Sequence, residues 1–175
     1  DKAWGIVVDD AKNSVYITGQ TTTNANGLDY LTLKYTLAGV NKWDAKYNGP
    51  GNGSDVANAI ALLPGNKVIV TGKSWGTNQN HDYATVKINN GGNNTEVSRY
   101  SMTGNSDDIA KDVSVSGNNN NASVYVTGYS ELIIDGQSSE SVISTVMIKD
   151  SDDNSEGSVN EPESFVLHQN YPNPF

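Results

Sequence analysis

The sequence predicts an all-β fold made of consecutive four-stranded antiparallel meanders. A segment of the form Val-x-[Ile/Val]-Thr-Gly occurs three times, at Val15–Gly19, Val68–Gly72 and Val124–Gly128. An Asp-x-Ala element precedes each copy, and an Asp-Tyr-x-Thr-x-Lys element follows the first two, with Tyr83 53 positions after Tyr30. A period near fifty is typical of propeller-like or solenoid arrays. In such arrays the repeats form the scaffold, and the loops between strands supply the binding surface.

Each strand of the first copy is a short run of β-forming residues. The expected strands are Ala3–Asp9, Ser14–Thr21, Tyr30–Thr36 and Asn41–Tyr47. The first is mostly apolar and suits a buried inner strand, whereas the last is polar and suits an outer strand. We expect Trp4 and Trp43 to be packing residues within these strands. Turn-forming segments such as Asn48–Ser54 separate the units.

The second copy repeats this pattern, and the third repeats it in part. The expected strands are Val56–Leu63, Lys67–Lys73, Tyr83–Asn89 and Thr95–Met102, then Ile109–Ser116, Ser123–Tyr129 and Val142–Lys149. The third copy has a longer loop between its last two strands, has Val142–Ile143 in place of Asp-Tyr, and lacks a fourth strand. The predicted divisions are 1–53, 54–106 and 107–149 for the three meanders, 150–161 for an acidic linker and 162–175 for a terminal segment.

Composition narrows the range of partners. The net charge is −9, and Arg99 is the one arginine. Nucleic acid is therefore not an expected partner, because phosphate binding needs a basic face. No apolar run reaches membrane-spanning length, so no membrane span is expected. There is no cysteine, which excludes disulfides and thiolate metal sites. The chain begins at the first residue of a repeat, so we expect it to be a piece of a longer protein.

The repeat motifs resemble those of a known family. "VYITG", "DYLTLKY", "DYATVKI" and "YNGPGNGSD" are similar to the bacterial β-propeller repeats called SBBP repeats, over about residues 1–149. The resemblance implies that the meanders are blades of a larger propeller, the third without its outer strand. It also implies a large secreted or cell-surface protein, and it carries no chemistry of its own.

The terminal segment "PESFVLHQNYPNPF" is similar to the start of the C-terminal sorting domain of the type IX secretion system. The residues that match are Pro162, Phe165, Leu167, Gln169, Asn170, Tyr171, Pro172, Asn173, Pro174 and Phe175. This resemblance implies that the secretion machinery is a partner. It also implies an extracellular or outer-cell-surface location in a Gram-negative bacterium. Such a signal is an address read by a receptor.

The repeated acids Asp1, Asp55 and Asp108 are interpreted as structural. A carboxylate that recurs once per unit is expected to accept hydrogen bonds from turn amides before the inner strand. Asp29 and Asp82 are interpreted in the same way. The two histidines, His81 and His168, lie in unrelated segments and give no support for a nucleophilic triad or a zinc site. No catalytic residue is predicted.

Two features are candidates for binding. Trp75 lies in the predicted loop Ser74–His81, where it could stack on a sugar ring or contact a protein, or else pack over the edge of the unit. His81 shares this loop. The acidic segment places Asp150, Asp152, Asn154, Glu156 and Glu161 at calcium-loop positions, although Ser155 replaces the usual Gly and the alternative is a plain linker. Calcium is therefore a candidate ion, and no other cofactor is expected.

The sequence favours a non-catalytic scaffold of a secreted or surface-displayed protein that binds a glycan, a matrix polymer or another protein. The alternative is the accessory propeller region of a secreted polysaccharide hydrolase or lyase, with its catalytic residues outside this chain. Calcium-stabilised adhesion is a third possibility.

Overall fold

The computed structural model describes residues 1–23, 27–102, 106–118, 121–134 and 138–150, with the backbone alone for 132–134 and 138–140. These residues form three antiparallel β-sheets of four, four and three strands, which confirms the all-β prediction. The one helical element among them is a single 3-10 turn, and no helix in the described part of the chain could cross a membrane. Asp152, Asn154, Glu156, Glu161, His168 and the sorting segment 162–175 lie outside the described residues.

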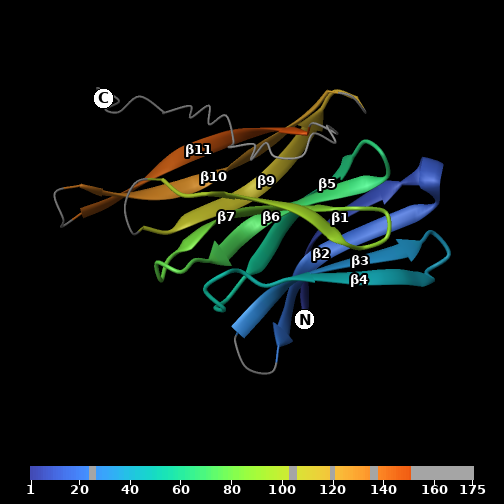
Figure 1. Ribbon diagram of the computed structural model, residues 1–175, viewed down its shortest axis with the longest axis horizontal. Coiled ribbons are helices and arrows are strands. Elements are labelled where there is room, and N and C mark those ends of the chain that lie inside the picture. The colour runs from blue at the N-terminus through green and yellow to red at the C-terminus, as the bar shows by residue number, and fades with distance from the viewer. Residues whose placement is uncertain (24–26, 103–105, 119–120, 135–137, 151–175) are drawn as a thin grey trace.

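The strands follow one another in each sheet, so that every unit is a meander (Figure 1). The first sheet contains β1 (Lys2–Asp9), β2 (Ser14–Thr23), β3 (Gly27–Thr36) and β4 (Asn41–Tyr47), with the 3-10 turn Asp10–Lys12 after β1. The second contains β5 (Val56–Leu63), β6 (Lys67–Trp75), β7 (His81–Ile88) and β8 (Asn94–Tyr100). The third contains β9 (Asp108–Ser116), β10 (Ala122–Ile134) and β11 (Ser138–Asp150).

The same β-bulge occurs in the first strand of every sheet. Trp4, Asn58 and Lys111 are the extra residues, and a glycine of the second strand pairs beside each of them. A Cβ atom on that glycine would overlap the carbonyl oxygen of Lys2, Val56 or Ile109 in turn. Gly19, Gly72 and Gly128 are therefore required by a close backbone approach at equivalent places, as the repeat predicts.

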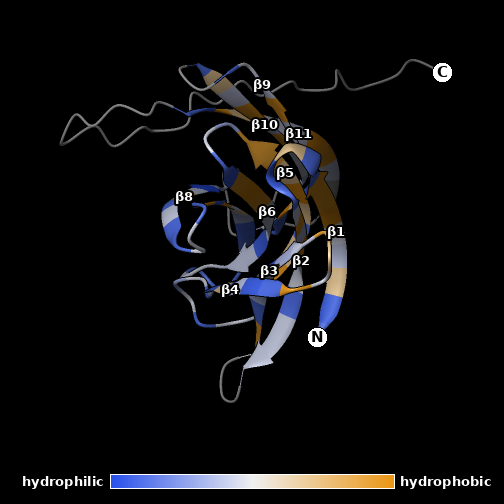
Figure 2. Ribbon diagram, turned by 90° about the vertical axis from the view of Figure 1, so that its right-hand side faces the viewer, coloured by the Kyte–Doolittle hydropathy of each residue, from blue (hydrophilic) through white to orange (hydrophobic). Residues whose placement is uncertain are grey.

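Successive sheets pack face to face. The first strand of the second and third units contacts the preceding sheet, β5 against β1, β2 and β3, and β9 against β5, β6 and β7. Val68 and Val70 are at most 1% exposed between the first two sheets, and Val124 and Val126 are 1% exposed between the last two. Figure 2 shows this apolar centre on β5 and β6 and the more hydrophilic outer strands β4 and β8. Burial of the second and third valine pairs is thus confirmed.

A tyrosine of each of the first two meanders reaches across to the next sheet. The Tyr30 hydroxyl donates a hydrogen bond to the carbonyl of Ala84 on β7 at 3.1 Å, and the Tyr83 hydroxyl donates to the carbonyl of Ser144 on β11 at 3.1 Å. Ala84 and Ser144 occupy the same repeat position. Burial raises the pKa of both tyrosines, so both hydroxyls remain protonated donors.

Two expectations about strands are wrong. The long loop expected between Tyr129 and Val142 is instead a continuation of the β10–β11 hairpin, whose pairing extends to Ile134 and Ser138. The β-forming run Leu132–Ile134 allows this extension. The expected burial of the first strand is also wrong. Trp4 is 57% exposed and Ile6 66% exposed, because no described sheet covers this face of β1.

Candidate ligand-binding sites

The strand connections lie at two opposite ends of the structure. We call the end with the β2–β3 and β6–β7 hairpins and the connections between sheets the loop end. The opposite end carries the β1–β2, β3–β4, β5–β6 and β7–β8 connections, and we call it the turn end. Both ends present side chains from adjacent sheets, so a ligand at either end would contact more than one repeat.

At the loop end, buried aspartates tie the connections to the sheets. The Asp55 carboxylate accepts hydrogen bonds from the Gly49 and Trp75 amides, both at 2.9 Å, and Asp108 accepts one from the Met102 amide at 3.0 Å. The predicted structural role is therefore confirmed for both. Burial raises the pKa of Asp108, and hydrogen bonds to its carboxylate oppose that rise. Asp1 instead accepts a hydrogen bond from the Thr21 hydroxyl at 2.7 Å.

The interpretation of Asp82 as a turn acceptor is wrong, because the residue lies inside β7 and forms an ion pair. Its carboxylate accepts a hydrogen bond from the Arg99 guanidinium at 2.8 Å. Arg99 also donates to the Tyr47 hydroxyl of the first sheet at 3.0 Å, so it links two sheets. Asp29, at the equivalent position of the first sheet, has its Oδ1 atom buried without a hydrogen-bond partner among the described residues.

Trp75 and His81 are paired strand residues rather than loop residues, because β6 and β7 extend to them. Their rings meet edge to face with centroids 4.8 Å apart. The glycine-rich connection packs on Trp75, since a Cβ atom at Gly53 would overlap the indole ring. These contacts occupy much of the indole surface that a sugar would need. Binding at Trp75 stays a prediction.

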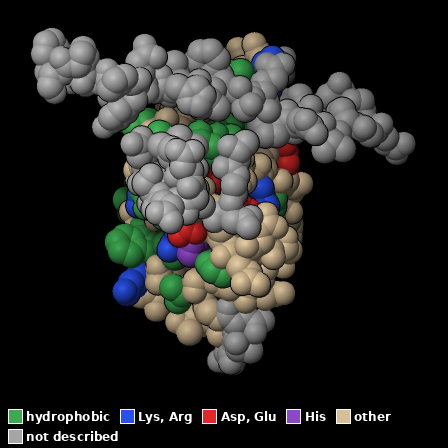
Figure 3. All heavy atoms as spheres, turned by 90° about the vertical axis from the view of Figure 1, so that its left-hand side faces the viewer, with side chains coloured by type: hydrophobic (Ala, Val, Ile, Leu, Met, Phe, Trp, Pro, Cys, Tyr) green, Lys and Arg blue, Asp and Glu red, His purple; other side chains and the backbone are tan. Residues whose placement is uncertain are grey.

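His81 is held by the connection to the third sheet. Its amide donates a hydrogen bond to Asp107 Oδ1 at 2.8 Å, and its ring Nδ1 lies 3.3 Å from the same oxygen. The ring Nε2 is buried and has no hydrogen-bond partner in the described part of the chain. Figure 3 shows acidic (red), basic (blue), histidine (purple) and apolar (green) side chains gathered at this end. No described hydroxyl is therefore placed for activation by this imidazole.

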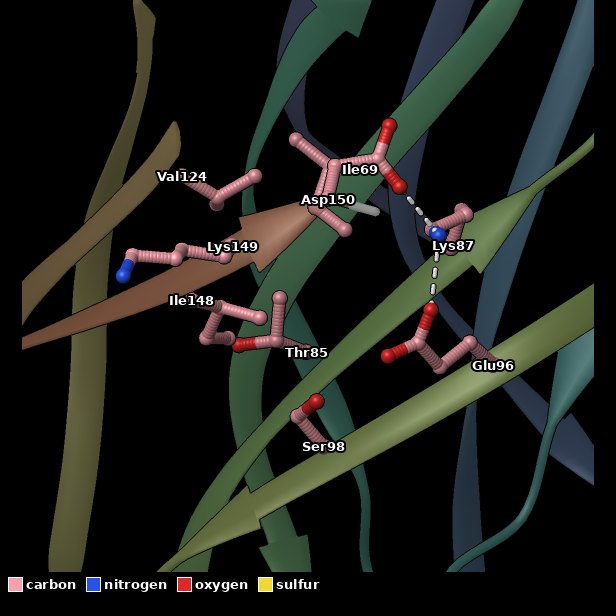
Figure 4. Close-up of a pocket in the computed structure, with 9 residues that line it drawn as sticks. All are labelled: Ile69, Thr85, Lys87, Glu96, Ser98, Val124, Ile148, Lys149 and Asp150. Atoms are coloured by element: carbon pink, nitrogen blue, oxygen red, sulfur yellow. Dashed lines mark ion pairs between the residues drawn. The ribbon is translucent and has the colours of Figure 1, made fainter. Parts of the chain in front are cut away.

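At the turn end, the groove between the second and third sheets is filled by its own ion pairs. We call it the second groove (Figure 4). The Lys87 ammonium forms ion pairs with Asp150 of β11 and with Glu96 of β8, the latter at 2.6 Å, and Lys67 lies 3.4 Å from Asp150. Burial of Lys87 disfavours its charge, but the hydrogen bonds that it donates to Asp150 and Glu96 outweigh this and raise its pKa. The remaining cavity is about 10 Å³.

The groove between the first and second sheets, which we call the first groove, is open, with a volume of about 500 Å³. Its lining includes Lys12, Lys34, Lys42, Trp43, Asn66 and Asn90. Lys34 is largely buried as a residue, and its ammonium donates a hydrogen bond to Asn90 Oδ1 at 2.6 Å and lies 5.1 Å from the centroid of the Tyr16 ring. The Trp43 indole donates to the Asn90 carbonyl at 2.9 Å and packs against Tyr16, which confirms it as a packing residue.

The two grooves are built from equivalent repeat positions. Lys34 of the first sheet corresponds to Lys87 of the second. Lys34 contacts Asn90 of the second sheet, and Lys87 contacts Asp150 of the third. Asn90 and Asp150 are equivalent, because each lies two positions after the end of the third-strand motif. Trp43 corresponds to Glu96, 53 residues apart. The second groove therefore has two carboxylates where the first has an amide and an indole. None of the three lysines of the first groove forms an ion pair with a described carboxylate.

Asp150 is the one calcium candidate that the structure describes, and two ammonium groups engage its carboxylate. Among the described residues, no group of three or more His, Cys, Asp or Glu side chains could hold a metal ion. The remaining calcium candidates stay predictions.

The sequence interpretation missed both grooves. Their residues come from different copies, and each looks like an ordinary surface residue within its own copy. The signal lay in the exchange of Asn90 for Asp150 and of Trp43 for Glu96 between aligned repeats. No protein-family model matches the chain, and no curated protein matches it.

Proposed function

We propose that this chain is a non-catalytic scaffold made of β-propeller blades, belonging to a secreted or surface-displayed bacterial protein that binds a glycan or another extracellular polymer. The observation that carries the proposal is the repeated contact between sheets. Each of the first two sheets packs on the next through the same tyrosine-to-carbonyl hydrogen bond and the same valine positions. Blades of a propeller pack on one another in this serial way.

The uncovered face of the first sheet supports a larger array. Val15 and Ile17 are half-buried, whereas the equivalent Val68 and Val70 are fully buried by the preceding sheet. Ile6 and Val8 are exposed beside them. An apolar face of this kind is covered in repeat proteins by a further unit. We infer that another blade packs on it in the intact protein.

The scaffold role is tested by incubating residues 1–175 with a panel of immobilised bacterial and algal polysaccharides and neutral controls. The proposal predicts retention on at least one polymer without release of reducing ends or unsaturated products. Release of such products by purified protein would overturn the non-catalytic assignment and favour the hydrolase or lyase alternative. Absence of binding to every polymer would overturn the binding role.

The export role of residues 162–175 is a separate proposal, supported by the motif alone. It is tested by replacing Tyr171 and Phe175 with Ala in the full-length protein, expressed in a bacterium that has a type IX system. Accumulation of the variant inside the cell, with the unaltered protein outside, is the expected result. Equal export of both proteins would contradict it.

A further inference from the structure

We propose that the first groove binds a carboxylate group of an anionic polysaccharide, one built from uronic acids. This inference rests on the proposed binding function and names the ligand class and the site. It follows from a comparison that the repeat itself provides, because the second groove shows what the same framework holds when a carboxylate is present.

The second groove defines where the carboxylate belongs. Asp150 and Glu96 lie on either side of the Lys87 ammonium, and together with Lys67 they form a cluster with two positive and two negative charges. Little space remains in the groove. The chain thus satisfies this framework internally.

The first groove keeps the equivalent lysine and loses both carboxylates. Lys34 is only 9% exposed, and its one hydrogen-bonding side chain among the described residues is the neutral amide of Asn90. An ammonium group has three donors, so most of the hydrogen-bonding capacity of Lys34 is left for another acceptor. Apart from the face of the Tyr16 ring, this largely buried lysine has no described group that balances its charge, which favours binding of an anion in the groove.

Two exposed lysines extend this positive site. Lys12 follows β1 in the 3-10 turn, and Lys42 lies on β4 beside Trp43, so three cations converge on one groove of a chain whose net charge is −9. The overall negative charge opposes a polyanion only at long range. At physiological ionic strength the screening length is about 8 Å, so the local lysines dominate at contact.

The rest of the lining suits a carbohydrate. Asn13, Asn66 and Thr36 line the groove, and their amide and hydroxyl groups both donate and accept hydrogen bonds, as sugar hydroxyls require. Asn13 and Asn66 are held in the left-handed region at the ends of the β1–β2 and β5–β6 turns, with φ of 51° and 62°. The open volume of the first groove lies within the range of small-ligand sites.

The test is calorimetric titration of residues 1–175 with a defined oligogalacturonate, its methyl-esterified neutral form and a sulfated oligosaccharide of similar length. The oligogalacturonate is expected to bind, the neutral form at least tenfold more weakly and the sulfated sugar more weakly than the carboxylated one. Tighter binding of the sulfated sugar would overturn the assignment of a carboxylate. Equal binding of the neutral form would overturn the ionic site.

Three variants locate the site. Asn90→Asp places an internal carboxylate beside Lys34 and is expected to weaken oligogalacturonate binding at least tenfold, and Lys12→Gln with Lys42→Gln is expected to do the same. The matched control is Asn78→Asp, which adds the same charge on an exposed residue at the loop end and is expected to change binding less than twofold.

Unchanged binding in Asn90→Asp, with the fold verified by circular dichroism, would overturn the proposal. Failure of this inference differs from failure of the proposed function. Binding of a neutral glycan that none of the groove variants alters would leave the scaffold role intact and remove only the first groove as its site.

Discussion

The first and second grooves share one framework and differ in how the charge of their central lysine is balanced. In the second groove Asp150 and Glu96 neutralise Lys87, whereas in the first Asn90 and Trp43 stand at the corresponding positions beside Lys34. The backbone bulges, glycines and cross-sheet tyrosines are the same on both sides. Repetition therefore marks the residues that build the scaffold, and departure from it marks the places where one unit has acquired its own property.

Substitutions at the repeated glycines are expected to destabilise the shared framework most. Gly72→Ala and Gly128→Ala would each drive a methyl group into the carbonyl oxygen of the adjacent bulge. We expect each to lower the free energy of unfolding by about 3 kcal/mol, the upper part of the range for overpacking. The control Gly91→Ala lies in an exposed turn. As a surface substitution it should change the free energy of unfolding by about 0.5 kcal/mol at most.

Urea unfolding monitored by tryptophan fluorescence measures all three glycine variants. A large effect at only one of the two buried glycines would contradict the equivalence of the sheets.

Substitutions at Asp150 and at Asn90 should change the stability of the fold in opposite directions. Asp150→Asn removes the partner of two lysines, although Glu96 still pairs with Lys87. We expect it to destabilise the fold by about 2 kcal/mol, less than the loss of a partner from an isolated buried pair. Asn90→Asp gives Lys34 a counter-ion and should stabilise the fold by up to about 1 kcal/mol. Thermal unfolding at low salt measures both changes. Destabilisation by Asn90→Asp would show that Lys34 needs no anion.

The cross-sheet tyrosines should respond equally. Tyr30→Phe and Tyr83→Phe each remove the hydroxyl that donates to a buried carbonyl of the next sheet, although the Ala84 carbonyl keeps the Thr71 hydroxyl as a donor. We expect each to lower the free energy of unfolding by about 1 kcal/mol, the usual cost of a lost hydrogen bond. The control is Tyr125→Phe, whose side chain is 41% exposed. Surface changes of this kind are close to neutral.

Chemical unfolding of the three tyrosine variants under identical conditions provides the comparison. A loss at Tyr83 without one at Tyr30 would separate the two interfaces.

A smaller effect on stability is expected at low pH, from the titration of Asp108. Burial raises the pKa of Asp108 above its ordinary value of 3.8, so the folded protein takes up this proton before the unfolded chain does. The cost of ionised Asp108 is therefore present at pH 7 and is lost as the pH falls through the folded pKa towards the ordinary value. Each unit of pKa difference contributes about 1.4 kcal/mol.

The measurement is the stability of the unaltered protein relative to Asp108→Asn, from pH 7 down to pH 4. The stability of the unaltered protein relative to Asp108→Asn should increase as the pH falls. A shift in the opposite direction would mean that hydrogen bonds from Ser130, Ser101 and the Met102 amide outweigh burial.

Much of the fold could be predicted because the same strand pattern occurs three times in the sequence. The positions of Val68, Gly72 and Asp55 follow from alignment of the copies, since a residue that recurs in every unit serves a contact that every unit makes. Burial of the first strand could not be predicted from its apolar sequence. Ile6 and Val8 are exposed because burial depends on a neighbouring sheet, and not on the strand that carries them.

The candidate sites could not be predicted for the same reason, because their contacts depend on how strands and sheets pair in space. Trp75 and His81 look like loop residues because a polar segment separates them, yet hairpin pairing places them in strands with their rings in contact. Lys34 and Asn90 are 56 residues apart, and only the stacking of one sheet on the next joins them. Such a groove can be predicted from the sequence only by comparing each copy with the copy that packs against it.

The most direct test of the account is a nuclear magnetic resonance titration of isotope-labelled residues 1–175 with oligogalacturonate. The account predicts shifts at the Trp43 indole N–H, the Asn90 side-chain amide and the Lys34 backbone amide, with none at the equivalent Glu96 and Lys87 amides. Shifts of similar size in both grooves, or shifts confined to the Trp75 and His81 region, would contradict the claim that the first groove is open to an external carboxylate and the second is closed by its own.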